Sequence, residues 1–344
     1  MPPAVDTVNR KEAREKMIKQ ALIAMTAAAL LTGCGNDAKD NTAGTAKAED
    51  GKTVGLVQLV EHPALDAASR GIQDAVKARG LNVTFDVQNA QADQSNLANI
   101  AQRFVSKNYP LIFAVATPAA QTIANATQTT PIVATAVTDY AAAKLVKSND
   151  KPGTNVTGSS DLNPVGAQLD LIMQFVPEAK TIGTIYNSSE INSQFQIELL
   201  KKELTRYNVK LIEGTVSSVN DVQQVAQGLV GKVQALYVPT DNIIASAMPV
   251  LTKITTPAKV PVITGEEGPL QGGGLATVGV DYYELGKIAG NMGADILEGK
   301  AKPQDMPIQF QKTFKVKVNE PVLKELGIAL PESLKGKAEL LNIR

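Results

Sequence analysis

Short apolar runs rich in β-branched residues recur along most of the chain, and segments with the period of an amphipathic helix separate them. Runs that are almost continuously apolar are typical of strands buried on both faces of a sheet. The clearest runs lie at residues 54–60, 111–115, 132–136, 182–186, 235–238 and 262–264. The clearest helical segments lie at residues 65–79, 91–107, 165–175, 191–207 and 220–229. Strands that alternate with helices form parallel sheets with right-handed crossovers, so the sequence predicts an α/β fold.

The alternation of strands and helices occurs twice in succession. The segment KPGTNVTG at 151–158 carries Pro and Gly and is predicted to cross between the two halves. A second crossing is expected near 275–280, after which a helix at 283–297 rejoins the first half and a strand at 314–318 returns to the second. We therefore expect two Rossmann-like lobes with parallel sheets, joined by crossing strands as a clamshell. The expected division is 53–156 with about 277–312 in lobe 1, and 157–276 with about 313–344 in lobe 2.

Cys34 is the only cysteine of the chain, which excludes an internal disulfide and a cluster of cysteine ligands for a metal. The preceding stretch MIKQALIAMTAAALL has a charged start and an apolar run of roughly ten residues, whereas a helix needs about 20 to span a bilayer. Together with Cys34, the small residues that follow this run resemble a bacterial lipobox. The resemblance implies that Cys34 carries fatty acyl chains such as palmitate. An ordinary signal peptide and a buried helix that happens to contain a cysteine are the alternatives.

Residues 1–33 are therefore interpreted as a signal segment and residues 34–52 as the lipidated cysteine with a flexible tether. Residues 1–16 are polar and charged, an unusual start for a secretory signal, so we expect translation to begin at Met17. Residues 35–52 contain no large apolar side chain and cannot bury enough surface to offset the entropy of ordering. This order predicts a domain anchored to the cell membrane on its extracytoplasmic face, either periplasmic or at the cell surface.

Charge balance and missing motifs exclude several functions. Lys and Arg together number 34, as do Asp and Glu, so no excess of basic residues favours nucleic acid. Beyond the signal segment no apolar run is long enough to cross a membrane. The chain contains no Walker A sequence, no HExxH and no GxSxG motif. We therefore expect no cofactor, no metal site and no enzyme activity.

Candidate ligand-binding residues follow from a rule for parallel sheets, in which ligands bind beyond the carboxyl ends of the strands. The polar residues selected near the ends of the expected strands are Glu61, Thr117, Ser160, Asp161, Asn187, Asp241 and Glu266. Thr117 precedes Pro118 at an expected helix start, where free N–H groups and the helix dipole can hold a carboxylate. Each candidate also has a structural interpretation, as a helix cap, a turn residue or a solvated charge at the rim. His62, the only histidine, is expected to pack at the mouth of a cleft.

Several segments spread over both expected lobes carry a family resemblance. They include VQLVEHPALD, VTGSSDLNPV, YVPTDNIIASAM and GLATVGVDYYELG. These segments resemble the ABC-transporter substrate-binding lipoproteins linked to aromatic amino-acid uptake, and the resemblance extends from Thr53 to the end of the chain. It implies a type I periplasmic-binding-protein fold and a monomer that captures a small solute between its lobes. It further implies delivery of that solute to an ABC permease, with energy from separate ATPase subunits.

An α-amino acid carries a carboxylate and an ammonium group, and burying both requires charged or polar partners. Thr117 and the helix N–H groups behind it can bind the carboxylate, the acidic candidates can pair with the ammonium, and Ser160 and Asn187 can donate or accept. A sugar favours stacked aromatic rings, and the chain has no Trp. The family resemblance favours an aromatic or large apolar side chain. Two alternatives stay open: a ligand-sensing lipoprotein that signals to a partner receptor, and a clamshell enzyme whose nucleophile is not recognised.

Overall fold

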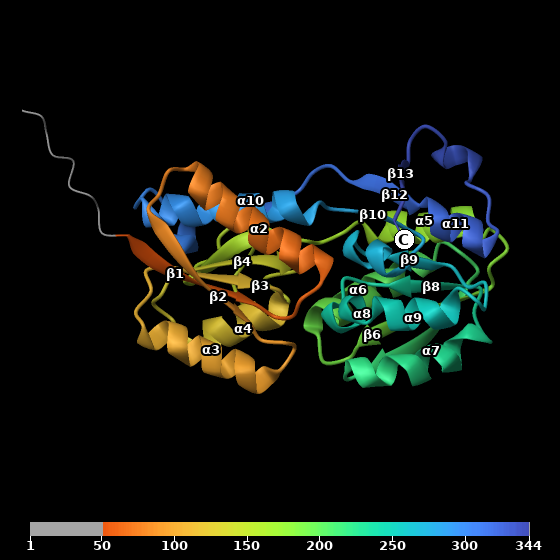
Figure 1. The fold of residues 1–344 in the computed structure, drawn as a ribbon, viewed down its shortest axis with the longest axis horizontal. Helices are drawn as coiled ribbons and strands as arrows, with labels where there is room; N and C mark the ends of the chain where they lie inside the picture. The colour runs from red at the N-terminus through yellow and green to blue at the C-terminus, as the bar shows by residue number, and fades with distance from the viewer. Residues whose placement is uncertain (1–50, 344) are drawn as a thin grey trace, which may run out of the picture. The chain divides into compact units, whose positions relative to one another are not determined.

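The computed structural model describes residues 51–343. The signal segment, Cys34 and nearly all of the tether lie outside the described residues. Residues 51–343 belong to one compact unit, which contains two β-sheets with helices packed on both faces of each (Figure 1). No helix between residues 51 and 343 has the length and apolar character needed to cross a bilayer.

The first sheet has six strands, and all of them run parallel. In spatial order the strands are β11 (Gln309–Phe310), β5 (Val156–Ser160), β4 (Ile132–Val137), β3 (Ile112–Val115), β1 (Lys52–Gln58) and β2 (Val83–Asn89). The covering helices are α2 (Pro63–Ala78) and α10 (Tyr282–Leu297) on one face, and α3 (Gln94–Ser106) and α4 (Thr117–Ala126) on the other (Figure 1). We call this sheet with its helices the first lobe.

The second sheet has seven strands and is parallel except where β10 and β12 pair. In spatial order the strands are β13 (Glu339–Leu341), β12 (Lys315–Asn319), β10 (Ala276–Gly279), β9 (Val262–Thr264), β8 (Ala235–Val238), β6 (Thr181–Asn187) and β7 (Lys210–Val216). One apolar cluster unites α5 (Val165–Phe175), α6 (Ile191–Leu204) and α11 (Glu320–Leu326), and another unites α7 (Val222–Val230), α8 (Asn242–Ser246) and α9 (Met248–Thr255). The two clusters cover opposite faces of the sheet, and the whole forms the second lobe.

The predicted class, an α/β fold of two Rossmann-like lobes, is confirmed. The point of the first crossing needs correction, because residues 156–160 form β5 and pair with β4 in the first sheet. Residues 157–160 therefore belong to the first lobe, and the chain crosses after Ser160. Later crossings fall at residues 280–281, between β10 and α10, and at residues 311–314, between β11 and β12. The lobes are thus connected three times.

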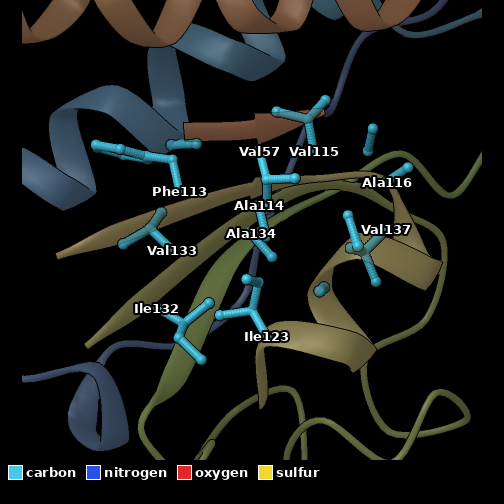
Figure 2. Close-up of a cluster of buried hydrophobic side chains, with 14 of the residues drawn as sticks. Val57, Phe113, Ala114, Val115, Ala116, Ile123, Ile132, Val133, Ala134 and Val137 are labelled. Carbon is cyan, nitrogen blue, oxygen red and sulfur yellow. The ribbon is translucent and has the colours of Figure 1, made fainter. Parts of the chain in front are cut away.

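Aliphatic side chains and alanines fill the interior of the first lobe. Figure 2 shows Ile132 of β4 beside Ile123 of α4, whereas Phe113 of β3 points toward the opposite face of the sheet, and all three are fully buried. Alanines at positions such as Ala114 leave room for the helices to approach the sheet. Close packing of this kind compensates for the small share of aromatic residues.

Helix α10 follows a strand of the second lobe but belongs to the first, and its glycines explain this attachment. A Cβ atom added at Gly286 would lie 2.1 Å from the carbonyl oxygen of Ala68 in α2. A Cβ atom at Gly71 would lie 2.2 Å from the carbonyl oxygen of Tyr283 in α10. The backbones of α2 and α10 therefore touch where both helices carry glycine, and this contact fixes the end of the crossing segment at residues 280–281.

We expect Gly286→Ala to lower the free energy of unfolding by about 1–3 kcal/mol, because the added methyl group must push α2 and α10 apart. Gly228→Ala in α7 is the matched control, since nothing lies within 4 Å of its Cβ position. Helix propensity predicts that the control gains about 0.5–1 kcal/mol. Urea denaturation measures both variants, and a Gly286→Ala protein as stable as the control would contradict the close packing.

Candidate functional site

The carboxyl ends of strands from both sheets surround one small cavity, as the rule for open parallel sheets requires. The cavity is narrow in this structure, with a volume of about 10 Å³. Its lining residues are His62, Leu65, Ala136, Asp161, Asn192, Thr240, Asp241, Asn242, Glu266 and Tyr282. His62, Leu65 and Ala136 come from the first lobe, whereas Asn192 and Thr240 are among those from the second. Residues of both lobes therefore enclose the same space.

Three of the ten lining residues are acidic, and none of the ten is a lysine or arginine. Asp161, Asp241 and Glu266 are 4%, 2% and 2% exposed. A buried carboxylate without a cation is unfavourable, so burial raises the pKa of all three groups. The cavity is therefore suited to a positively charged group of a ligand.

Asp161 connects two of the three crossings between the lobes. Its Oδ2 accepts a hydrogen bond of 2.6 Å from the hydroxyl of Tyr282, which begins α10. Its Oδ1 accepts a bond of 2.9 Å from Oγ1 of Thr138, just beyond β4. These donors oppose the rise in the pKa of Asp161 that burial causes. Each carboxylate oxygen keeps a second lone pair with which it can accept a hydrogen bond from a ligand.

Asp241 lines the cavity, and its carboxylate also organises the second lobe. Oδ1 caps α8 by accepting a bond of 2.8 Å from the N–H of Ile244. Oδ2 accepts bonds from the N–H of Asn187, at 2.6 Å, and from Oγ of Ser193, at 2.7 Å. Asp241 therefore caps α8 and also lines the cavity.

Glu266 has the most available carboxylate oxygen of the three acids. Its Oε2 accepts a bond of 2.5 Å from the N–H of Gly268, whereas Oε1 makes no hydrogen bond within residues 51–343. Burial, opposed by the hydrogen bond from the N–H of Gly268 and reinforced by the charges of Asp161 and Glu267, raises the pKa of Glu266 to about 8. A cation beside Oε1 would stabilise the ionised carboxylate.

Glu190 is a buried acid that the sequence analysis missed. Its Oε2 accepts a bond of 3.0 Å from Nδ2 of Asn192, and bonds from the backbone N–H and Nδ2 of Asn242. Burial, followed by the charge of Asp241, raises the pKa of Glu190 to about 7. Glu190 lies in the sequence NSSEIN, where nothing distinguishes it from an exposed turn residue. It stands behind two residues of the cavity wall.

Buried polar atoms without a partner among the described residues include three in the cavity wall. They are Nδ1 and Nε2 of His62 and Oδ1 of Asn192. Burial lowers the pKa of His62 to about 4, although the side chain of Asn242 opposes this change. The imidazole is therefore neutral near pH 7 and offers one donor and one acceptor. Atoms of this kind are accounted for when a ligand or water binds them.

The four remaining candidates do not line the cavity. Glu61 is exposed, next to His62. Thr117 is buried in the first turn of α4, and its Oγ1 has no partner in residues 51–343. Ser160 uses its hydroxyl in a turn, donating to the carbonyl of Thr138 at 2.8 Å. Asn187 contacts Asp241 through its backbone N–H, while its side chain accepts a bond of 2.9 Å from the N–H of Ser189.

Two of the seven described non-glycine residues with positive φ lie where β3 and β4 end. Ala116 has φ of 91° and Ala136 has φ of 55°, although neither residue is glycine. The pairing of β4 with β5 also shifts register between Ala134 and Val137. Such conformations cost on the order of 1–3 kcal/mol each and cluster at ligand sites. Ala136 lies in the cavity wall, so one of the two strained residues belongs to the proposed site.

Metal binding finds no support in the part of the chain that the structure describes. Within residues 51–343 no three His, Cys, Asp or Glu side chains are arranged to hold an ion. The acids around the cavity instead accept hydrogen bonds from hydroxyl and N–H groups.

Residues 53–341 match the family model described as ABC transporter substrate binding protein. The chain belongs to this family. A curated relative named tyrosine-binding protein, from Clostridioides difficile strain R20291, is 40% identical over 91% of this chain and 93% of its own length. Substrate-binding proteins of ABC transporters bind small solutes and act outside the cytoplasm with a permease partner.

Solved structures of similar proteins extend the comparison. An ABC domain from Streptococcus pneumonia in complex with L-Trp is 37% identical over 85% of this chain and 99% of its own, with a TM-score of 0.82. A ligand-free, open substrate-binding protein with adhesive properties from Clostridium difficile is 43% identical over 85% of this chain and 100% of its own, with a TM-score of 0.65. A solute binding protein from Bacillus halodurans with bound myo-inositol, 13% identical at a TM-score of 0.56, shares the fold.

We expect the free energy of unfolding of the ligand-free protein to fall as the pH rises from about 6.5 to about 8. Glu190 and Glu266 have folded-state pKa values of about 7 and about 8, above the ordinary 4.5. In this interval the folded state therefore binds more protons than the unfolded state, and stability decreases with pH. His62 acts in the opposite direction only below its ordinary pKa of 6.5, because burial lowers that value to about 4.

Urea denaturation at several pH values measures this slope, and one substitution isolates a contributor. Glu266→Gln should flatten the slope and stabilise the protein near pH 8, because the amide has no charge to bury. Glu284→Gln is the matched control, since Glu284 is an exposed acid that pairs with Lys287 and does not line the cavity. A slope that Glu266→Gln leaves as steep as the control would contradict the assignment.

Proposed function

We propose that this protein is the extracytoplasmic receptor of an ABC importer and binds an amino acid with an aromatic or large apolar side chain. The cavity between the lobes is the proposed binding site. The observation that carries the proposal is the set of three buried carboxyl groups with no lysine or arginine beside them in the cavity wall. The relatives named for tyrosine and solved with L-Trp support the class of ligand.

The ammonium group of an amino acid supplies the cation that the cavity lacks. Burying an isolated ammonium ion is prohibitively unfavourable, so its three N–H donors each require an acceptor. Oε1 of Glu266 is free to accept, and Asp161 retains lone pairs on both oxygens. We assign these two residues to the ammonium, with Asp241 completing the negative potential of the wall.

The carboxylate of the ligand requires donors, and the first turn of α4 offers them. The backbone N–H groups at the start of a helix have no partner within the helix and favour an anion. Thr117 adds a buried hydroxyl that no described residue uses. Thr117 lies at the carboxyl end of β3, on the edge of the sheet that faces the second lobe. We propose that this turn holds the carboxylate, with Ser160 and Asn187 supporting the surrounding loops.

Closure of the lobes is the proposed means of capture. The structure agrees better with the L-Trp complex, at a TM-score of 0.82, than with the ligand-free open protein, at 0.65, although its identity to the latter is higher. This difference is expected if the lobes stand here as they do around a ligand. A ligand that bridges both lobes shifts the population toward such a closed form, with bending at the three crossings.

Anchoring through Cys34 completes the proposal. The lipobox-like segment and the polar tether would hold a monomeric receptor at the outer face of the membrane, near its permease and the ATPase subunits that drive transport. The family assignment supports an extracytoplasmic location, while the lipid itself is inferred from the sequence around Cys34. A receptor needs no catalytic group, and we assign none.

We expect Glu266→Gln to weaken binding of the best amino acid by about 1.5–3 kcal/mol, because the ammonium loses its charged acceptor. A thermal-shift screen of amino acids identifies that ligand, and calorimetry then measures its affinity for each variant. The control Glu284→Gln, at an exposed acid outside the cavity wall, should bind as the unsubstituted protein does. Equal affinities for the two variants would remove Glu266 from the site, and a panel without any binder would refute the amino-acid proposal.

Cys34→Ala should move the protein from the membrane fraction to the soluble fraction. Acyl chains contribute about 0.8 kcal/mol per buried methylene to membrane binding, and alanine cannot carry them. Fractionation makes the measurement, and mass analysis of the uncleaved precursor tests separately whether translation starts at Met17. If the Cys34→Ala protein still sediments with membranes after an uncleaved signal segment is excluded as its anchor, the lipid anchor is wrong.

A further inference from the structure

The amide oxygen of Asn192 is an acceptor without a donor. Asn192 lies in the first turn of α6, is 5% exposed and lines the cavity. Its Oδ1 is buried and makes no hydrogen bond with any residue that the structure describes. An unpaired buried acceptor loses its hydration without compensation, so its presence in a cavity wall indicates a donor on the ligand.

Hydrogen bonds on the other side of the amide determine which atom is the oxygen. Nδ2 of Asn192 donates to the backbone carbonyl of Thr240 and to Oε2 of Glu190, both at 3.0 Å. A backbone carbonyl can only accept, so the nitrogen must face Thr240. Turning the amide over would place its oxygen against two acceptors. The atom left for the cavity is therefore the oxygen, and Asn192 is an acceptor by construction.

Glu190 holds this arrangement from behind the cavity wall. Besides Asn192 it accepts bonds from the backbone N–H and from Nδ2 of Asn242, a second residue of the wall. Glu190 is 4% exposed, and no described lysine or arginine forms an ion pair with it. Its other oxygen, Oε1, accepts a longer bond of 3.4 Å from Nδ2 of Asn187. A buried acid without a cation is unfavourable, so we infer that Glu190 serves to orient the asparagines around it.

We propose that Glu190 is a positioning residue that fixes Asn192 as an acceptor for the ammonium group of the ligand. This inference rests on the proposed function and makes it more specific. The three N–H donors of an ammonium group then match three acceptors, namely Glu266, Asp161 and Asn192. The site therefore selects compounds with an α-ammonium group and rejects the same acids without it.

Calorimetry with paired probes tests the proposal. The probes are L-tyrosine, L-tryptophan and L-phenylalanine, each beside the same acid without its ammonium group. The unsubstituted protein should bind at least one amino acid more tightly than its deamino counterpart. Asn192→Leu should weaken that amino acid about tenfold or more, the loss expected for one hydrogen bond to a charged group. It should leave the affinity for the deamino acid within about threefold, because the ammonium contact is absent there.

Variants of Glu190 separate positioning from general stability. Glu190→Ala frees the amide of Asn192 to turn, so it should lose selectivity as Asn192→Leu does. Glu190→Gln can keep its oxygen at the position of Oε2, where it accepts from Asn192 and Asn242 and loses only the longer bond from Asn187, so it should keep the selectivity. Glu198→Ala, an exposed position on the same helix, is the control and should match the unsubstituted protein. If Glu190→Ala does not fold, the Asn192→Leu and Glu190→Gln results still decide.

Each outcome has one meaning. If Asn192→Leu weakens the amino acid and the deamino acid equally, the asparagine is structural and the proposal is wrong, while the proposed function stands. Loss of selectivity in Glu190→Gln, with normal selectivity in the control, would refute positioning by an acceptor. If the unsubstituted protein binds none of the probes, the proposed function fails for these ligands and the inference fails with it.

Discussion

Burial of several acids around one cavity, with no lysine or arginine in its wall, is the constraint on which the functional part of this structure depends. Asp161, Asp241 and Glu266 line the cavity, and Glu190 lies directly behind it. Buried carboxylates need hydrogen-bond donors or a cation. Hydroxyl and N–H groups of the crossings and of the loops after the strands supply some of these donors. These donors are not sufficient, because the pKa values of Glu190 and Glu266 stay raised and Oδ1 of Asn192 has no donor among the described residues. A cationic group enclosed by the lobes would stabilise the ionised carboxylates and would donate hydrogen bonds to the unpaired acceptors.

The same acids connect ligand binding to the movement of the lobes. Asp161 follows β5, where the chain first leaves the first lobe, and it accepts a bond from Tyr282, where the chain has just returned. The close backbone contact of α10 with α2 makes the returning segment part of the rigid first lobe. In the proposed closure, bending would be confined to the short crossings, as expected for a hinge. A ligand held by Asp161 and the second lobe would then act at the hinge itself.

Most interior strands could be predicted from the sequence, but the interior strand β5 was taken for part of the crossing segment, and the edge strands were not predicted. β2 and β7 lie at the sheet edges and are only partly buried, so they lack a continuous apolar run. In the cavity, the strand-end rule identified Asp161, Asp241 and Glu266 because topology alone brings those positions together. Glu190 and Asn192 were missed because their roles depend on contacts with the loop before α8, far away in the sequence. Glu61 satisfied the rule, yet its side chain is exposed, since position does not fix direction.

A crystal structure of the protein with its best-binding amino acid would test the central claim most directly. The account predicts the ammonium nitrogen within about 3 Å of Oε1 of Glu266 and Oδ1 of Asn192, the distance of a charged hydrogen bond. It also predicts the lobes in the arrangement seen here, with the acids enclosed. An amino acid bound with its carboxylate toward Glu266, or bound outside this cavity, would contradict the account.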